Sequence, residues 1–258
     1  MKAQKIYYYS HTHDDEFMAP PQTIKSISGD YVYVKTDFKS RLYAFIAYRL
    51  IAMPIAFVHT RLIKRIKVVN KQALTPYLKD GYFIFANHTQ IHSDAFAPTI
   101  VAFPKRLYTI VNANNVSLPG LGNATKLLGA LPLPDDLQAS KNFIRALKKR
   151  LDQGYGILIY PEAHIWPYFT GIRNFADNSF KYPIKHDVPS FSFTTTYQKR
   201  RNGRLKLVMY VDGPFYSPLE LDKDKRQSYL HALVSNKMKE RASLSNYQKY
   251  QYHEVEKL

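Results

Sequence analysis

Short apolar runs alternate with amphipathic stretches along the chain from about Gly81 onward. Each apolar run is rich in aliphatic and aromatic residues and is bounded by turn residues, which predicts strands over 81–88, 106–112, 155–162, 188–197 and 205–211. Between them, apolar residues at helical spacing predict an amphipathic helix over 139–151, and a charged closing helix is expected over 222–241. Strands that alternate with helices predict an α/β fold with a mixed, mainly parallel sheet flanked by helices.

A longer apolar run, Leu42 to Val58, precedes this region and contains Arg49 and Pro54. As a helix, its 17 residues would span about 25 Å, which is shorter than the roughly 30 Å hydrocarbon core of a bilayer. Basic residues follow directly, which favours a helix that lies in, or dips into, an anionic membrane face. A buried core helix with a basic exit is the alternative. The predicted division is therefore a tail with a membrane-associating helical segment over 1–70, and an α/β domain over 71–258.

The chain of 258 residues has 37 Lys and Arg against 20 Asp and Glu, which gives a net charge of +17. A surface of this charge attracts anionic lipid headgroups or nucleic acid, so composition leaves a membrane and RNA as competing partners. The absence of cysteine excludes a disulfide framework, a thiolate nucleophile and thiolate metal sites. Residues 1–39 lack the apolar core and cleavage site of a secretion signal.

Two predicted strands run into loops whose side chains can carry chemistry. These side chains are Asn87, His88, His92 and Asp94 after the first strand, and Glu162 and His164 after the third. Reactive residues of α/β sheets lie at the carboxyl ends of strands, where loops cross, so these side chains are candidate site residues. An Asp beside a His can fix its tautomer and leave the second ring nitrogen free to take a proton from a hydroxyl. A helix N-cap is the structural alternative for Asp94.

Four sequence blocks, in this order, resemble the glycerolipid acyltransferase family, whose best-known members are the lysophosphatidic acid acyltransferases. The blocks are Asn87-His88 to Asp94, Leu118-Pro119-Gly120 through Gly129-Ala130-Leu131-Pro132, Tyr160-Pro161-Glu162, and Val188-Pro189. The apolar run from Leu42 also stands where members of that family carry membrane-docking helices.

The chain departs from the family pattern in its first, second and third blocks. Five residues separate His88 from Asp94, one more than is usual in the family. In a regular helix the extra residue would rotate Asp94 by about 100°, so the pair is expected only if His88 lies in a loop that absorbs the insertion. After Glu162 the usual Gly, Thr and phosphate-binding Arg are replaced by Ala163, His164 and Ile165. The second block lacks its usual closing Arg, since Pro134-Asp135 stands there. Either the acceptor is not a phosphate, or a cation for it comes from elsewhere, and the nearest candidates by sequence are Lys126, Arg173 and Lys181.

The resemblance implies an O-acyltransferase in which His88 deprotonates the acceptor hydroxyl, Asp94 orients His88, and Glu162 holds a polar group of the acceptor. His164 is a further candidate for an acceptor contact. Acyl-CoA or acyl carrier protein would be the acyl donor, and a lysophospholipid or a glycerol phosphate, foremost 1-acylglycerol-3-phosphate, the acceptor. No metal or bound cofactor is expected, because the thioester already carries the activation. The expected location is the cytoplasmic face of the cell membrane, peripheral or monotopic, with an anionic membrane surface as partner and no nucleic acid.

Two other functions remain open from the residues alone. His88, His92, Asp94, Glu162 and His164 offer ligands for a metal-dependent hydrolase, and two His four residues apart share one helical face. A catalytically degenerate homologue that binds a membrane or a nucleic acid is the second alternative, because the third block has lost its Arg.

Overall fold

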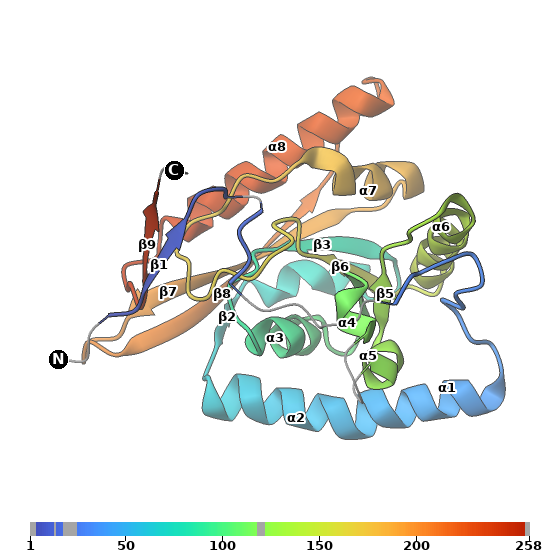
Figure 1. Cartoon of the computed structure of the whole chain (residues 1–258), viewed down its shortest axis with the longest axis horizontal. Helices are drawn as coiled ribbons and strands as arrows, with labels where there is room; N and C mark the ends of the chain where they lie inside the picture. Colours follow the sequence, from blue (N-terminus) through green and yellow to red (C-terminus); the bar gives the residue numbers. More distant parts are fainter. Residues whose placement is uncertain (1–3, 13, 18–24, 118–121, 256–258) are drawn as a thin grey trace.

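A computed structural model describes residues 4–12, 14–17, 25–117 and 122–255 of the protein. Its centre is a seven-stranded sheet in the order β2-β8-β7-β3-β6-β4-β5 (Figure 1). The strands are β2 (Lys67–Val69), β3 (Tyr82–Ala86), β4 (Leu107–Val111), β5 (Ala130–Pro132), β6 (Gly156–Ile159), β7 (Ser190–Lys199) and β8 (Leu205–Phe215). Only β7 and β8 pair antiparallel among these strands. The predicted mixed, mainly parallel sheet is therefore confirmed.

Helices cover both faces of the sheet (Figure 1). On one face lie α6 (Leu137–Asp152), η4 (Asp177–Phe180), α7 (Lys181–His186) and α8 (Lys223–Ala242), and on the other lie η3 (Lys71–Tyr77) and α3 (Ser93–Ala102). Strand β3 is buried along its whole length, because its alternate residues enter the two core clusters on opposite faces. Its carboxyl end is thereby held rigidly at the sheet centre.

The strand that leads into the third block, β6, follows α6, whose start is capped by Asp136. This carboxylate accepts the main-chain N–H of Ala139, as expected for an N-cap. Phe143, Leu147 and Leu151 then face the sheet in the same core cluster as β6. Helices α4 (Asn114–Ser117) and α5 (Gly122–Leu128) join β4 to β5. Of the second sequence block, Leu118-Pro119-Gly120 lies outside the described residues. Gly129 forms the turn directly before β5, with a φ of +107°.

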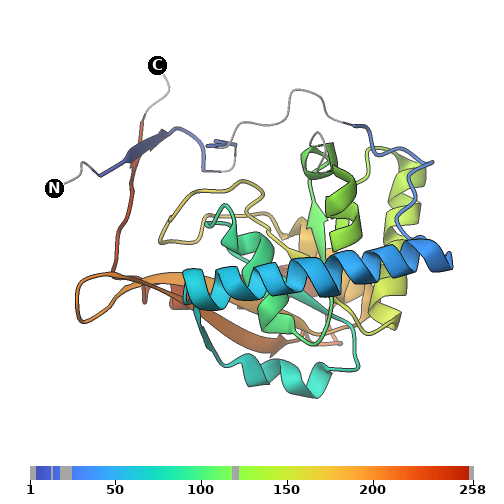
Figure 2. The ribbon, with the colours of Figure 1, turned by 90° about the horizontal axis from the view of Figure 1, so that it is seen from below.

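A continuous helical rod over residues 38–63 lies against α3 and α5 (Figure 2). It comprises α1 (Phe38–Phe45), η1 (Ile46–Ala52), α2 (Met53–Phe57) and η2 (Val58–Ile63), and its backbone stays helical at each junction. The rod is longer than the predicted 17 residues and is, by length and composition, able to cross a membrane. Tyr48, Met53 and Ala56 pack against Ile100 of α3.

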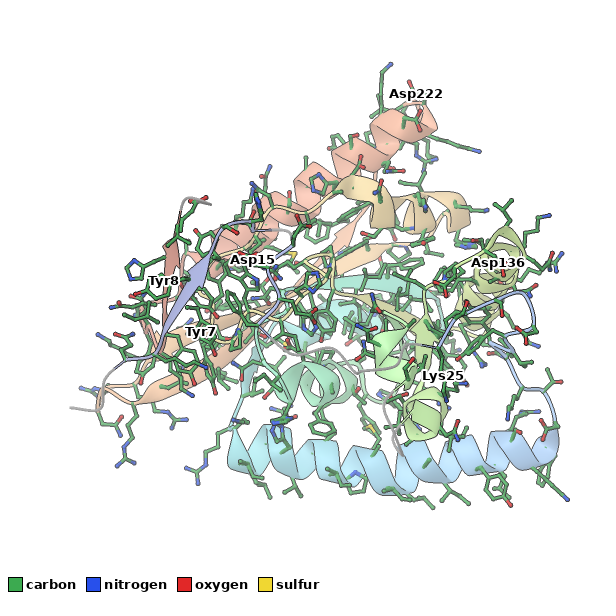
Figure 3. All side chains as sticks on the ribbon, in the orientation of Figure 1. Tyr7, Tyr8, Asp15, Lys25, Asp136 and Asp222 are labelled. Atoms are coloured by element: carbon green, nitrogen blue, oxygen red, sulfur yellow. The ribbon has the colours of Figure 1, made fainter. Side chains whose placement is uncertain are left out.

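The opposite side of this rod is apolar and exposed, and its side chains project away from the sheet (Figure 3). The exposed apolar residues are Phe38, Leu42, Tyr43, Phe45, Leu50, Ile51, Ile55, Phe57, Val58, Leu62 and Ile63. One face of the rod is therefore part of the core, and the opposite face is exposed and apolar.

Segments from both ends of the chain form a second, two-stranded sheet. Strand β1 (Ile6–Tyr9) pairs in parallel with β9 (Gln251–Glu254), and Tyr7 and Tyr8 lie in it at one end of the molecule (Figure 3). Residues before the predicted boundary at residue 70 also take part in the main sheet and its packing. Strand β2 precedes it and is an edge of the main sheet, and Ile27 of the tail packs against Val116.

Candidate functional site

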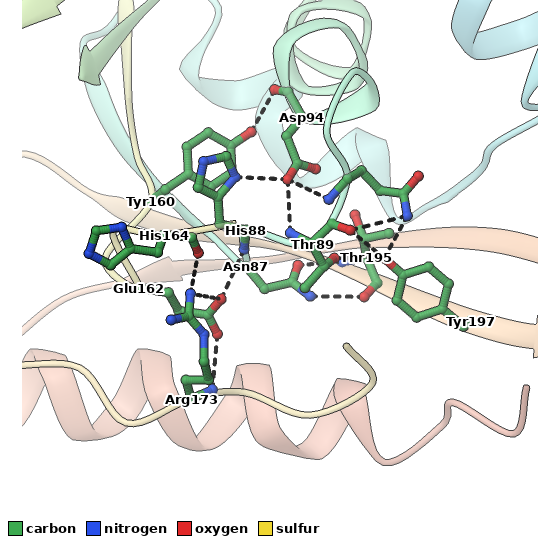
Figure 4. A network of polar contacts seen from close by, with 11 residues as sticks. Asn87, His88, Thr89, Asp94, Tyr160, Glu162, His164, Arg173, Thr195 and Tyr197 are labelled. Carbon is green, nitrogen blue, oxygen red and sulfur yellow. Dashed lines mark hydrogen bonds and ion pairs between the residues drawn. The ribbon is translucent and has the colours of Figure 1, made fainter. Parts of the chain in front are cut away.

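His88 and Asp94 form a hydrogen-bonded pair at the carboxyl end of β3 (Figure 4). The Nδ1 atom of His88 lies 2.9 Å from Oδ2 of Asp94. The strand ends at Ala86 and α3 begins at Ser93, so the residues between form a loop. This loop absorbs the extra residue, as the sequence required if the pair was to form.

The Asp94 carboxylate also organises the loop that carries His88. Its Oδ2 accepts the main-chain N–H groups of Thr89 and Gln90, each at 2.9 Å. The helix N-cap is His92, which makes no side-chain capping bond, and Asp94 lies in the first turn. Asp94 is therefore not the N-cap that the sequence offered as an alternative: its carboxylate holds the N–H groups of the loop and one nitrogen of His88.

The rest of the loop is tied to β7 by polar side chains. The Asn87 side-chain amide donates to the main-chain carbonyl of Thr195 and accepts the main-chain N–H of the same residue. Gln90 donates to the hydroxyl of Tyr197, which donates to the hydroxyl of Thr89. Sequence reasoning missed Tyr197 as a site residue, because its strand spacing predicts only a core position.

Glu162 is placed differently from the predicted acceptor contact. Its side chain is 0% exposed and accepts the main-chain N–H groups of His88 and Arg173, each at 3.0 Å. Burial raises the pKa of Glu162, and the nearby Arg173 guanidinium opposes this shift. The carboxylate thus holds the backbone of His88 and is closed to a substrate.

Arg173 is likewise an internal residue. Its side chain is 1% exposed, and its guanidinium lies 3.5 Å from Glu162 and 4.8 Å from the centre of the Trp166 ring. It donates to the carbonyls of Thr12 and His164. With its hydrogen bonds directed into the protein, Arg173 is a counter-ion of Glu162, and the predicted phosphate contact does not match its position.

Two further predicted acceptor contacts, Lys126 and His164, lie apart from each other. Lys126 is in the last turn of α5, with its ammonium 4.6 Å from the ring centre of Tyr31, and it has no contact with His88 among the described residues. The His164 side chain is 31% exposed, and its Nδ1 lies 3.7 Å from a Glu16 carboxylate oxygen. The loop that carries His164 runs beside the base, since Trp166 donates its N–H to the carbonyl of His88.

The geometry leaves one nitrogen of His88 available for chemistry. Nδ1 is held by Asp94, the side chain is 18% exposed, and no described residue bonds to Nε2. Within the described ranges, no three His, Asp or Glu side chains are grouped to hold a metal ion, so the alternative of a metal-dependent hydrolase gains no support. An imidazole oriented by a buried carboxylate can act as a general base towards a bound hydroxyl.

Comparison with known proteins bears on the family and the fold of the chain. The model of the acyltransferase family matches residues 65–196, which include both strand ends of the site. The fold is similar to the crystal structure of the 1-acyl-sn-glycerophosphate (LPA) acyltransferase PlsC from Thermotoga maritima, with a TM-score of 0.54 and 16% identity over 81% of this chain and 84% of that chain. No curated protein matches the chain at a significant level.

Proposed function

Because the chain belongs to the acyltransferase family and is an acyltransferase enzyme, we propose that it transfers a fatty acyl group from a thioester to a lipid hydroxyl. The donor is acyl-CoA or acyl carrier protein. The acceptor is a lysophospholipid or glycerol phosphate, foremost 1-acylglycerol-3-phosphate, the class named for the PlsC structure of similar fold. The observation that carries the proposal is the His88–Asp94 pair with its free Nε2.

In the proposed mechanism, Nε2 of His88 takes the proton of the acceptor hydroxyl as that oxygen attacks the thioester carbonyl carbon. Asp94 holds the proton on Nδ1 and stabilises the imidazolium that forms. Collapse of the tetrahedral intermediate breaks the carbon–sulfur bond, and the leaving thiolate takes the proton back from Nε2. The products are an ester and a free thiol, and the imidazole returns to its starting state.

We assign the acceptor contact to His164. Among the predicted acceptor contacts, Glu162 and Arg173 form a buried ion pair, and Lys126 contacts Tyr31. His164 combines a partly exposed side chain with a loop that hydrogen-bonds to the backbone of His88.

Replacement of His88 tests the mechanism directly. His88→Ala should lower acyl transfer by about 10³-fold, because the general base is lost, while thermal stability and vesicle binding stay close to wild type. The assay is thiol release from acyl-CoA and acyl carrier protein donors against a panel of acceptors, with the lipid product identified by mass spectrometry. The exposed His92→Ala serves as control and should keep its activity. Full turnover in His88→Ala would exclude this imidazole from the reaction.

We further propose that the enzyme sits on the cytoplasmic face of the cell membrane, with the rod over 38–63 in the bilayer surface. One face of the rod is packed on α3 and α5, so the rod lies along the domain, while its exposed face is apolar. This combination favours an in-plane, monotopic helix over a crossing one. Basic residues that follow the apolar face support an anionic surface as partner.

Charges on the exposed face of the rod should abolish this association. Ile51, Ile55 and Leu62 share one helical face and are more than half exposed. Replacement of all three by Glu should reduce co-sedimentation with anionic vesicles at least about 10-fold, through lost apolar burial and added repulsion. The control is Leu137→Glu, at an exposed site on α6. Unchanged vesicle binding in the triple variant would place the docking element elsewhere, and a gel shift with RNA would test the alternative partner.

A further inference from the structure

Helix α3 contains a proline one turn after the carboxylate of the site. In a regular helix the N–H of residue 98 would donate to the carbonyl of residue 94, but Pro98 has no N–H and its ring crowds that carbonyl. Asp94 is buried, and a buried carbonyl without a partner is costly. The main chain of Asp94 therefore requires a hydrogen-bond donor from another element.

Tyr160 supplies that donor. It directly follows β6, which neighbours β3 in the sheet, and its hydroxyl donates to the Asp94 carbonyl at 2.6 Å. Burial holds the pKa of Tyr160 well above its ordinary value, so the hydroxyl keeps the proton that it donates.

The ring of Tyr160 also lies against the base itself. Its centroid is 4.2 Å from that of the His88 imidazole, and the two planes differ by 20° (Figure 4). One tyrosine thus contacts both members of the pair, the imidazole through its face and the carboxylate residue through its main chain.

We propose that Tyr160 is a positioning residue of the His88–Asp94 pair: its hydroxyl holds the carbonyl that Pro98 leaves free, and its ring fixes the plane of the imidazole. Asp94 is then anchored at two points, since its side chain receives the loop N–H groups and its main chain receives Tyr160. This second anchor compensates for the longer loop between His88 and Asp94. The inference rests on the proposed function, in which His88 is the base.

The test removes one hydroxyl and keeps the ring. Tyr160→Phe should lower kcat about 10-fold, the effect of one lost positioning hydrogen bond, with KM changed less than about 2-fold. The matched control is Tyr33→Phe, which also removes a hydroxyl that donates to a main-chain carbonyl, that of Pro132. Its kcat should stay within about 2-fold of wild type.

Nitrogen NMR of the His88 ring supplies a readout that does not depend on turnover. At about pH 8.5, where imidazoles are ordinarily neutral, the wild-type ring should carry its proton on Nδ1, facing Asp94. Tyr160→Phe should show a mixture of the two tautomers, whereas Tyr33→Phe should not.

The role of the proline is tested by a double-mutant cycle. Pro98→Ala returns an N–H to α3 that can donate to the Asp94 carbonyl. Tyr160→Phe should therefore lower kcat by about 2-fold or less in the Pro98→Ala background, against about 10-fold in the wild type. Equal costs in both backgrounds would overturn the link to Pro98.

Two results would overturn the positioning role. The first is a Tyr160→Phe variant with the wild-type tautomer of His88 and the wild-type kcat. The second is a Tyr160→Phe variant that loses activity only in proportion to its loss of folded protein, by the same factor as Tyr33→Phe. A wild-type enzyme without acyl transfer would refute the proposed function alone, because the NMR comparison still decides what Tyr160 does to His88.

Discussion

At the scale of single residues, the site depends on a buried ion pair. Glu162 and Arg173 are each at most 1% exposed at the side chain, and the carboxylate accepts two main-chain N–H groups besides facing the guanidinium. Removal of one partner from such a pair leaves an uncompensated buried charge, which is more damaging than the pair is stabilising. Since one of those N–H groups belongs to His88, the pair also fixes the backbone of the base.

Arg173→Met should therefore destabilise the protein by about 3 kcal/mol at pH 7, measured by urea unfolding. Burial already raises the pKa of Glu162, and loss of the guanidinium that opposes this shift raises it further. A raised carboxyl pKa favours the folded state at low pH, because the native protein then binds the extra proton. The difference in the free energy of unfolding between wild type and variant should accordingly become smaller as the pH falls from 7 towards about 4.5. Arg173→Lys, which keeps the charge, is the control; a deficit independent of pH would show that Glu162 is not its source.

The sequence was sufficient to predict the family, which the match over 65–196 confirms, and the contact between His88 and Asp94, which is present in the structure. Both residues follow one strand, so their proximity is a local property. The partner of Glu162 could not be predicted in the same way. Arg173 lies eleven residues further on, across an irregular loop without periodicity, and by sequence it resembled a free cation. Tyr160 and Tyr197 were missed because strand-end tyrosines are compatible with an ordinary core.

At the scale of elements, periodic segments were predicted well and irregular ones poorly. The predicted core strands and the helices over 139–151 and 222–241 are present, with small shifts at their ends. The rod over 38–63 extends beyond both ends of the predicted apolar run, since polar residues such as Lys39 and Arg61 continue the helix. Strands β1 and β9 were not predicted, because each is four residues long and is defined by its partner at the other end of the chain.

At the scale of the whole molecule, the two chain ends close around the loop that carries Glu162 and His164. Trp166 stacks on Tyr252 with planes 6° apart and donates its indole N–H to the carbonyl of Asp15. Tyr252 also donates to the carbonyl of Pro167 at 2.7 Å. Trp166 is fully buried and packs this loop against the two chain ends.

A substitution that weakens the packing of the chain ends should increase amide exchange next to His88, although His88 itself is unchanged. Tyr252→Ala should destabilise the protein by about 2 kcal/mol, through lost stacking and one lost hydrogen bond. Amide exchange should accelerate at Trp166 and Tyr168, whose N–H groups bond to the carbonyls of His88 and Thr89. The control is Tyr229→Ala, at an exposed position of α8. Unaltered exchange at Trp166 and Tyr168 in Tyr252→Ala would mean that the loop is held without the chain ends.

The contact between α3 and the rod over 38–63 has a kinetic consequence. Phe96 in the second turn of α3 lies 5.1 Å, centre to centre, from His59 of the rod, and the loop with His88 leads directly into that helix. With the rod in the bilayer surface, as proposed, the base stands close above the lipid headgroups. A lysolipid could then react while its tail stays among its neighbours, and the rate would follow the mole fraction of acceptor in the vesicle instead of its bulk concentration.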